Sequence, residues 1–242
     1  MAAVAARTSA AGMAGESGIK LLDAIGNSGM ILFEKLRRCL LLSLASLLLG
    51  GAAHAYSAPK TVLVLGDSLS AEYGLARGTG WVALLEQRLK SQKLEATLVN
   101  ASVSGETTSG GRTRLPALLK KHKPDVVVIE LGANDGLRGL PVAAAEANLR
   151  AMVGDARQAG ARVLIVGNRV PPNYGRDYAE KFFAMFGAIS KDTKSGLAPF
   201  MLDGVADKIE LFQPDRLHPL ASAHPIILGN IWPHLLPILR TK

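Results

Sequence analysis

The chain has 242 residues, of which 48% are hydrophobic and 20% are charged. This length suits one domain, or two at most, and the composition excludes a disordered or collagen-like chain. The net charge is +8, but the basic residues are scattered and aromatic residues make up only 5%, so we do not expect nucleic acid as a partner. The single cysteine, Cys39, excludes a disulfide or a cysteine-based zinc site within one chain, and no metal site is expected.

The first 55 residues are expected to stand apart from the folded domain. Lys35, Arg37 and Arg38 precede a short apolar run that ends in Ala53-His54-Ala55. This order of basic, apolar and small residues is typical of a signal peptide, and a buried core helix is the alternative. The apolar run is shorter than 18 residues, so no stable membrane span is expected. We interpret residues 1–34 as an untranslated or disordered N-terminal extension, residues 35–55 as a signal peptide and residues 56–242 as a secreted or periplasmic domain.

From residue 60 onward, strand-like and helix-like segments alternate. Short apolar runs predict strands at residues 61–65, 96–99, 125–131, 162–166 and 199–202. Apolar residues at helical spacing predict helices at residues 81–89, 115–119, 142–159, 178–189 and 226–239. The last helix contains Pro233 and Pro237, which are expected to kink or fray it. The alternation predicts one α/β domain with a parallel sheet that is covered by helices on both faces.

Polar residues follow these strands, at the edge where parallel sheets bind ligands. Ser68 comes just after the first strand, where a serine is either a helix N-cap or a nucleophile that needs a base. His218 is the best candidate for the base, because Asp215 lies three residues before it and can orient the imidazole. Taken alone, this pair is also compatible with a metal-ligand pair or a structural loop.

Acyl transfer also requires hydrogen-bond donors for the oxyanion that forms on the substrate. Gly105 offers a backbone N–H with no side chain beside it, and Asn134 offers a side-chain amide. Ser68 adds its own N–H. These three residues are the candidate oxyanion donors.

Four segments resemble, in order and spacing, the sequence blocks of the SGNH (GDSL) hydrolase family. They are GDSLS at 66–70, the glycine of SVSGET at 102–107, GAND at 132–135 and DRLH at 215–218. The resemblance covers residues 61 to about 238 and is strongest to the bacterial thioesterase, lysophospholipase and arylesterase branch. Two departures are Ala133, in place of a frequent glycine, and Arg216, where a glycine between the Asp and the hydrophobic residue is more usual.

The resemblance implies a flavodoxin-like, three-layer αβα sandwich and no cofactor. It makes Ser68 the nucleophile, His218 the general base and Asp215 its partner, with Ser68, Gly105 and Asn134 as the oxyanion hole.

The expected function is that of a secreted or periplasmic serine esterase. Its substrate would be a small-molecule acyl ester or thioester, and we expect a monomer. One alternative is an acyl- or acetyltransferase, in which a sugar hydroxyl rather than water resolves the same acyl-enzyme. A second is a non-catalytic binding module, which is disfavoured because Ser68, Asp215 and His218 are all present.

Overall fold

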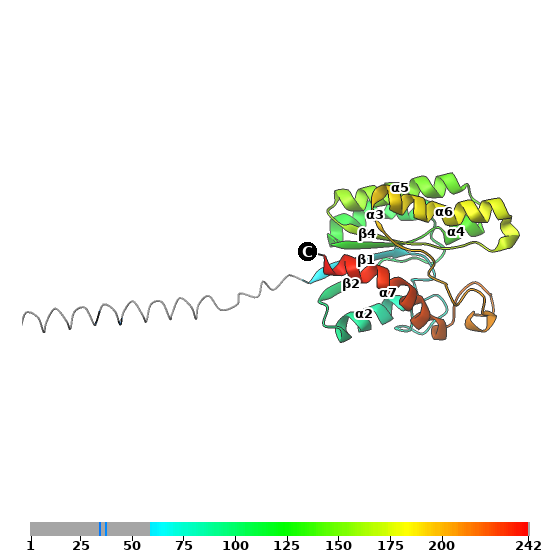
Figure 1. Ribbon diagram of the computed structural model, residues 1–242. Coiled ribbons are helices and arrows are strands. Elements are labelled where there is room, and N and C mark those ends of the chain that lie inside the picture. Colours follow the sequence, from blue (N-terminus) through cyan, green and yellow to red (C-terminus); the bar gives the residue numbers. More distant parts are fainter. Residues whose placement is uncertain (1–33, 35–36, 38–58, 242) are drawn as a thin grey trace, which may run out of the picture. The chain divides into compact units, whose positions relative to one another are not determined.

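The computed structural model of the chain describes residue 34, residue 37 and residues 59–241. The expected N-terminal extension and signal peptide lie outside the described residues, apart from Glu34 and Arg37, which are helical. The remainder, residues 59–241, forms a sheet with helices on both sides (Figure 1). None of the helices in this described part is both long and apolar enough to cross a bilayer.

Five parallel strands form the sheet, in the order β2-β1-β3-β4-β5. Their bounds are Lys60–Gly66 (β1), Ala96–Asn100 (β2), Val126–Glu130 (β3), Arg162–Val166 (β4) and Gly196–Ala198 (β5). This is the flavodoxin-like strand order. The chain moves from β1 outward to β2 and then returns to β3 on the other side of β1. A crevice forms where the order reverses, so the carboxyl ends of β1 and β3 are the expected place for a ligand.

Helices cover both faces of the sheet, which confirms the predicted three-layer sandwich (Figure 1). The helices are α2 (Trp81–Ser91), α3 (Thr108–His122), α4 (Ala133–Leu137), α5 (Val142–Gln158), α6 (Arg176–Thr193) and α7 (His224–Arg240). Helices α2 and α7 pack on one face, and α3, α5 and α6 pack on the other. Alternation along β1 explains the two cores. Val62 and Val64 point into the first, and Leu63 and Leu65 point into the second.

The last strand lies earlier than the sequence predicts. The structure places β5 at Gly196–Ala198, and the predicted strand at residues 199–202 is wrong. Pro199 has no N–H to donate to β4, so the chain leaves the sheet there. Met201 and Leu202 are buried as expected of a strand, but they pack in the core beneath α2 and α7 from a turn.

The expected fraying of the last helix at its prolines is also wrong, since α7 continues to Arg240. A proline removes the N–H that would bond to the carbonyl four residues earlier. For Pro233 and Pro237, those carbonyls belong to Gly229 and to Pro233 itself, and both residues are exposed. Water can therefore satisfy them. The prolines lie on the outer side of a helix whose other face is held by the core.

Candidate active site

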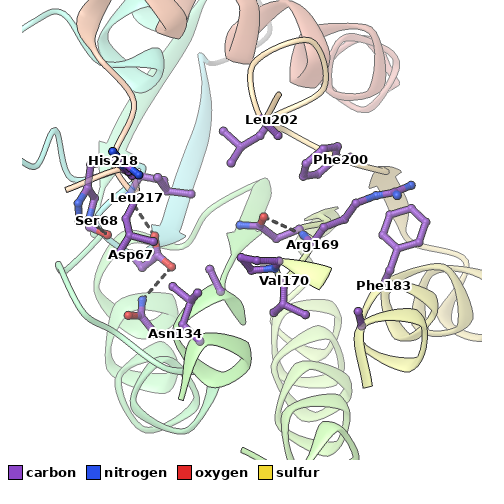
Figure 2. A pocket seen from close by; sticks show the side chains of 18 of the residues that line it. Asp67, Ser68, Asn134, Arg169, Val170, Phe183, Phe200, Leu202, Leu217 and His218 are labelled. Carbon is purple, nitrogen blue, oxygen red and sulfur yellow. Dashed lines mark hydrogen bonds between the residues drawn. The ribbon is translucent and has the colours of Figure 1, made fainter. Parts of the chain in front are cut away.

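A cavity of about 790 Å³ opens at the carboxyl edge of the sheet (Figure 2). Segments that follow β1, β3, β4 and β5 contribute to its wall, as the reversal of strand order predicts. Most of the wall is apolar, and it includes Leu69, Leu137, Val170, Leu202, Phe212 and Leu217. Ser68, Asn134 and His218 line the cavity together, whereas Asp215 and Gly105 are not among its lining residues.

The tight turn after β1 presents Ser68 to this cavity. Gly66 ends the strand, and a Cβ added there would lie 2.7 Å from Ser70 Oγ and 2.9 Å from Glu130 Oε2, so no larger residue fits. The Asp67 carboxylate then accepts a hydrogen bond of 3.0 Å from the Leu69 N–H, which closes the turn. Ser68 is thereby half-buried at the strand tip, between two buried neighbours.

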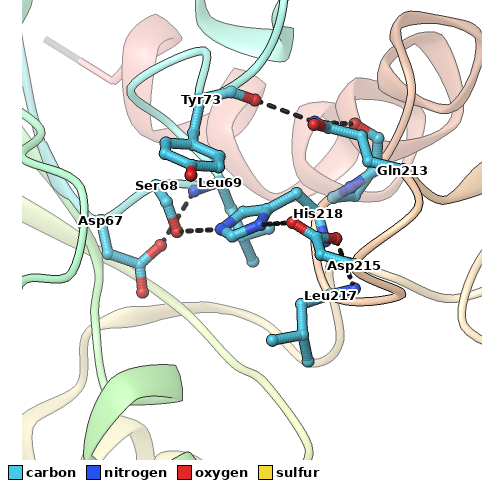
Figure 3. A network of polar contacts seen from close by, with 9 residues as sticks. Asp67, Ser68, Leu69, Tyr73, Gln213, Asp215, Leu217 and His218 are labelled. Atoms are coloured by element: carbon cyan, nitrogen blue, oxygen red, sulfur yellow. Dashed lines mark hydrogen bonds and ion pairs between the residues drawn. The ribbon is translucent and has the colours of Figure 1, made fainter.

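A continuous hydrogen-bonded chain joins Ser68 to His218 and Asp215 (Figure 3). Ser68 Oγ lies 2.9 Å from His218 Nε2, and His218 Nδ1 lies 2.7 Å from Asp215 Oδ2. The other Asp215 oxygen accepts the backbone N–H groups of Leu217 (2.9 Å) and His218 (3.0 Å). The hydrogen bond from the His218 ring, followed by those two N–H groups, lowers the pKa of Asp215 to about 2. The carboxylate is therefore charged at any pH at which the imidazole can act as a base.

Tyr73 and Gln213 hold His218 from the other side (Figure 3). The Tyr73 ring stacks at 4.4 Å on the imidazole, tilted by 38°. Gln213 donates from its amide to the Tyr73 carbonyl (2.9 Å), and its backbone N–H donates to the His218 carbonyl (2.7 Å). Gln213 thus connects the two loops that carry the serine and the histidine. Sequence reasoning missed both residues, because no motif or spacing marks them.

The candidate oxyanion donors come from two further segments. Gly105 has a φ of +78°, which favours glycine, and the nearest atom to an added Cβ is Arg138 Nη2 at 3.9 Å. Within residues 59–241, neither its N–H nor the Ser68 N–H has a protein acceptor. Asn134 lies in α4 and donates to Asp67 Oδ2 at 3.1 Å. An amide carries two N–H bonds, so one remains for a ligand.

Asp135 ties these two segments together. Its buried carboxylate accepts the Thr108 hydroxyl at 2.6 Å and the Thr108 N–H at 2.8 Å. Thr108 begins α3, directly after the loop of Gly105, and Asp135 follows Asn134 in α4. The two loops therefore keep a fixed relative position.

A buried pair of carboxyl groups lies beneath the Ser68 turn. Glu130, at the end of β3, accepts hydrogen bonds from the Ser70 hydroxyl (2.7 Å) and from the Asp67 N–H (3.3 Å). Burial, and then the Asp67 charge, raise the pKa of Glu130 well above its usual range. Burial also raises the pKa of Asp67, to about 6, against the hydrogen bonds from Leu69, Asn134 and Glu130. The pair therefore retains a proton to a higher pH than two isolated carboxyl groups would, and Asp67 Oδ2 accepts the hydrogen bond that orients the Asn134 amide.

Replacing Glu130 with glutamine is expected to reduce the pH dependence of stability. The unfolded chain releases this proton near pH 4.5, whereas the folded protein retains it to higher pH. Above pH 4.5, the wild type should therefore lose stability relative to Glu130→Gln by about 1.4 kcal/mol per pH unit until the folded pKa is reached. Thermal unfolding of both proteins at pH 5 and pH 8 measures this. A stability difference that does not change with pH would mean that the folded protein does not retain this proton above pH 4.5.

The other histidines in residues 59–241 lie away from Ser68. His224 is buried, and its Nδ1 accepts the Trp81 N–H at 2.9 Å, so it joins α7 to α2. Burial lowers the pKa of His224, which keeps its ring neutral. His122 is half-buried at the end of α3, and His234 is exposed on α7. In the described part of the chain, no three His, Cys, Asp or Glu side chains are grouped as metal ligands would be.

Comparisons with known proteins agree with the fold. The model of the GDSL-like lipase/acylhydrolase family matches residues 64–226. Esterase TesA of Pseudomonas aeruginosa is 48% identical over 204 residues, which cover 84% of this chain and all of that protein. The thioesterase 1/protease 1/lysophospholipase L1 of Escherichia coli strain K12 is 41% identical over 184 residues, covering 76% of this chain and 87% of that one.

A similar solved structure is that of the psychrotrophic esterase EstA from Pseudoalteromonas sp., inhibited by monoethylphosphonate. It superimposes with a TM-score of 0.72 and 42% identity, and the match covers 75% of this chain and all of that one. The family match spans more than half of the chain and includes the segments that carry Ser68, Gly105, Asn134 and His218. The chain therefore belongs to the GDSL-like lipase/acylhydrolase family, and it is a hydrolase.

Proposed function

We propose that the chain is an exported serine esterase that hydrolyses carboxylic esters and acyl thioesters through an acyl-enzyme. The observation that supports this most is the hydrogen-bonded chain from Ser68 through His218 to Asp215, at the wall of an apolar cavity. The relatives point the same way, since they are named as an esterase and as a thioesterase and lysophospholipase.

The first half of the reaction forms the acyl-enzyme. His218 Nε2 accepts the hydroxyl proton at its 2.9 Å contact while Ser68 Oγ attacks the carbonyl carbon. The electron pair of the C=O bond moves to oxygen, where the donors of the oxyanion hole meet it. The tetrahedral intermediate then collapses, the bond to the leaving oxygen or sulfur breaks, and His218 returns its proton to the leaving group. Asp215 stabilises the imidazolium that exists between these two steps.

The second half repeats the sequence with water as the nucleophile. His218 accepts a proton from the water, the hydroxide attacks the acyl carbon, and the proton then returns to Ser68 Oγ as the acid leaves. The phosphonate inhibition of the similar esterase EstA supports a tetrahedral species in this cavity, because a phosphonate mimics that geometry.

The Asn134→Ala substitution is expected to lower kcat by about 10²–10³ and to change KM much less. The amide is directed at a charge that develops only in the transition state, and removal of one such donor costs about 2.7–4 kcal/mol. Steady-state kinetics on one short-chain p-nitrophenyl ester measure both constants. An unchanged kcat with a raised KM would mean that Asn134 only binds the substrate.

A substrate panel tests the proposed activity itself. The purified protein is offered p-nitrophenyl esters and acyl-CoA thioesters of increasing chain length, with and without a sugar as acceptor. Hydrolysis of both classes supports the proposal, and the apolar cavity wall favours acyl chains over sugars. Acylated sugar as the main product would instead identify an acyltransferase.

Export is proposed from the sequence of residues 35–55. The basic, apolar and small residues in this segment have the order of a signal peptide, and cleavage after Ala55 would make Tyr56 the first residue of the mature protein. The described domain begins only a few residues later, with β1 at Lys60. N-terminal sequencing of the periplasmic or secreted protein is expected to start at Tyr56. A mature form that still contains Cys39 would contradict export by cleavage.

A further inference from the structure

We propose that the cavity has a second recognition point, at which Arg169 binds an anionic group at the far end of the acyl chain. The preferred acyl group would then be one that ends in a carboxylate, as in half-esters and half-thioesters of dicarboxylic acids. This inference rests on the proposed esterase function. It adds a substrate class that the triad alone does not imply.

Arg169 lines the same cavity as Ser68, but on the opposite side. It follows β4 by three residues, and the buried Asn168 fixes its backbone through a 2.8 Å hydrogen bond from the Arg169 N–H. Figure 2 shows Ser68 and His218 on one side of the cavity and the Arg169 side chain on the other. Val170 and Leu202 lie between them in this view and also line the cavity. Ser68 therefore lies at one end of the cavity and the Arg169 cation at the other, and Arg216, next to Leu217 in the chain, is a further cation of the lining.

Two aromatic rings hold the guanidinium in place. Its central carbon lies 3.8 Å from the centroid of the Phe183 ring and 5.3 Å from that of Phe200. Both rings line the cavity as well. Stacking on aromatic faces leaves the edge of a guanidinium, with its N–H groups, free for a partner. The rings thus fix the orientation of the group without using its hydrogen-bond donors.

Arg169 has no counter-ion in the described part of the chain. Among residues 59–241, no carboxylate forms an ion pair with it and no acceptor receives its side-chain N–H groups. The nearby acid that lines the cavity, Glu180, is paired with Arg176 at 2.7 Å. Arg176 and Glu180 offset each other in charge, so this pair does not compensate the positive charge of Arg169. One anion would neutralise the Arg169 guanidinium. A carboxylate suits it, because a planar guanidinium can donate two parallel hydrogen bonds to the two carboxylate oxygens.

The apolar wall indicates which part of the substrate reaches Arg169. A methylene chain fits beside Val170 and Leu202, whereas the amide-rich arm of a CoA leaving group would lose hydrogen bonds there. A methyl-terminated chain long enough to reach Arg169 would displace water from the cation without replacing it. A terminal carboxylate would instead pair with the cation, so the site should discriminate between the two.

The test compares pairs of substrates that differ only at the far end of the chain. p-Nitrophenyl half-esters of dicarboxylic acids with 6–12 carbons are paired with p-nitrophenyl esters of monocarboxylic acids of equal length. At the best length, the ratio of kcat/KM for the two is expected to fall about tenfold in Arg169→Met, which keeps an apolar stem of similar length but removes the charge. The change should appear as a higher KM for the half-ester with kcat unchanged, because Arg169 does not touch the reacting atoms. Arg169→Lys should retain part of the preference.

Arg88→Met is the matched control. Arg88 also stacks on an aromatic ring, with its guanidinium carbon 5.5 Å from the Trp232 ring centroid, but it does not line the cavity. Its removal should leave the ratio unchanged. If Arg169→Met changes the melting temperature but not the ratio of the two kcat/KM values, Arg169 only stabilises the fold and the inference is wrong. The inference is also wrong if Arg169→Met affects acyl-CoA relative to acyl-N-acetylcysteamine, since the cation would then serve the leaving group.

A binding measurement separates this inference from the proposed function. Calorimetry on the Ser68→Ala variant compares a dicarboxylic monoamide with the fatty amide of equal length, with and without Arg169→Met. A preference for the carboxylate that disappears with Arg169→Met supports the inference even if the wild type hydrolyses no ester. Equal binding of the two amides overturns it even if the esterase activity is found.

Discussion

Ser68→Ala is expected to abolish measurable hydrolysis of both esters and thioesters. One acyl-enzyme serves both substrate classes, so loss of the Ser68 hydroxyl, at 2.9 Å from His218 Nε2, should remove about 10⁶ of kcat in each case. The measurement is kcat on one p-nitrophenyl ester and one acyl-CoA, with the fold checked by circular dichroism. Residual activity above about 10⁻³ of wild type would mean that water attacks the substrate directly or that another nucleophile acts.

His218→Ala should be nearly as severe, because Ser68 would have no base near pH 7. The two substitutions should not add in the double variant, since both residues act on one proton transfer. His234→Ala is the matched control, because His234 is exposed on α7. His224→Ala is not a suitable control, because loss of the imidazole leaves the buried Trp81 N–H without its acceptor and should destabilise the fold. An active His218→Ala would refute the assignment of the base.

The fold could be predicted from the sequence because the strands are buried on both faces. Such strands appear as continuous apolar runs, and the runs at 61–65 and 162–166 fall within one residue of β1 and β4. The edge strand β5 has only three residues, and two of them are small. The apolar pattern instead predicted a strand at the buried turn that follows β5, because Met201 and Leu202 belong to the core as strand residues do. A hydrophobic pattern reports burial, not hydrogen bonding.

The grouping of the three proposed reacting residues could be predicted because their chemistry restricts the residue types. A nucleophile, a base and an acid at the carboxyl edge of a parallel sheet leave few candidates, and the structure brings Ser68, His218 and Asp215 into contact. Their supports could not be predicted. Glu130 had a signal, as a charged residue that ends the otherwise apolar run of β3, but its partner Ser70 is 60 residues away. Tyr73 and Gln213 act through tertiary contacts that leave no pattern in the sequence.

Arg216 shows how a departure from the family pattern is accommodated. It has a φ of +58°, in the left-handed region that favours the glycine more usual at this position. The Asp215 carboxylate accepts hydrogen bonds from the N–H groups of Leu217 and His218. These bonds hold the loop in this conformation although residue 216 carries a side chain. The Arg216 side chain lines the cavity near Leu217. The substitution therefore alters the cavity wall and leaves the contact between Asp215 and His218 intact.

Asp215→Asn is expected to lower kcat by about 10⁴ while leaving the fold intact. The carboxylate, with its pKa lowered to about 2, accepts a hydrogen bond from His218 Nδ1–H at 2.7 Å, so Nε2 is free to accept the proton of Ser68. An asparagine can still accept the backbone N–H groups of Leu217 and His218 through its carbonyl oxygen. Its NH₂ group would then face Nδ1, which would have to become the acceptor. The ring proton would move to Nε2, and the base would be lost.

The measurement is kcat on the same p-nitrophenyl ester. Asp207→Asn is the matched control, because Asp207 is exposed and its carboxylate is not a hydrogen-bond partner of the His218 ring. The control is expected to stay within a few-fold of wild type. Thermal unfolding of the two variants should differ little, since the backbone contacts of residue 215 are retained. A loss of less than about tenfold in Asp215→Asn would mean that the tautomer of His218 is set elsewhere. Tyr73 stacks on the ring and offers no hydrogen bond to either ring nitrogen, so we expect the contact with Asp215 to select the reactive tautomer.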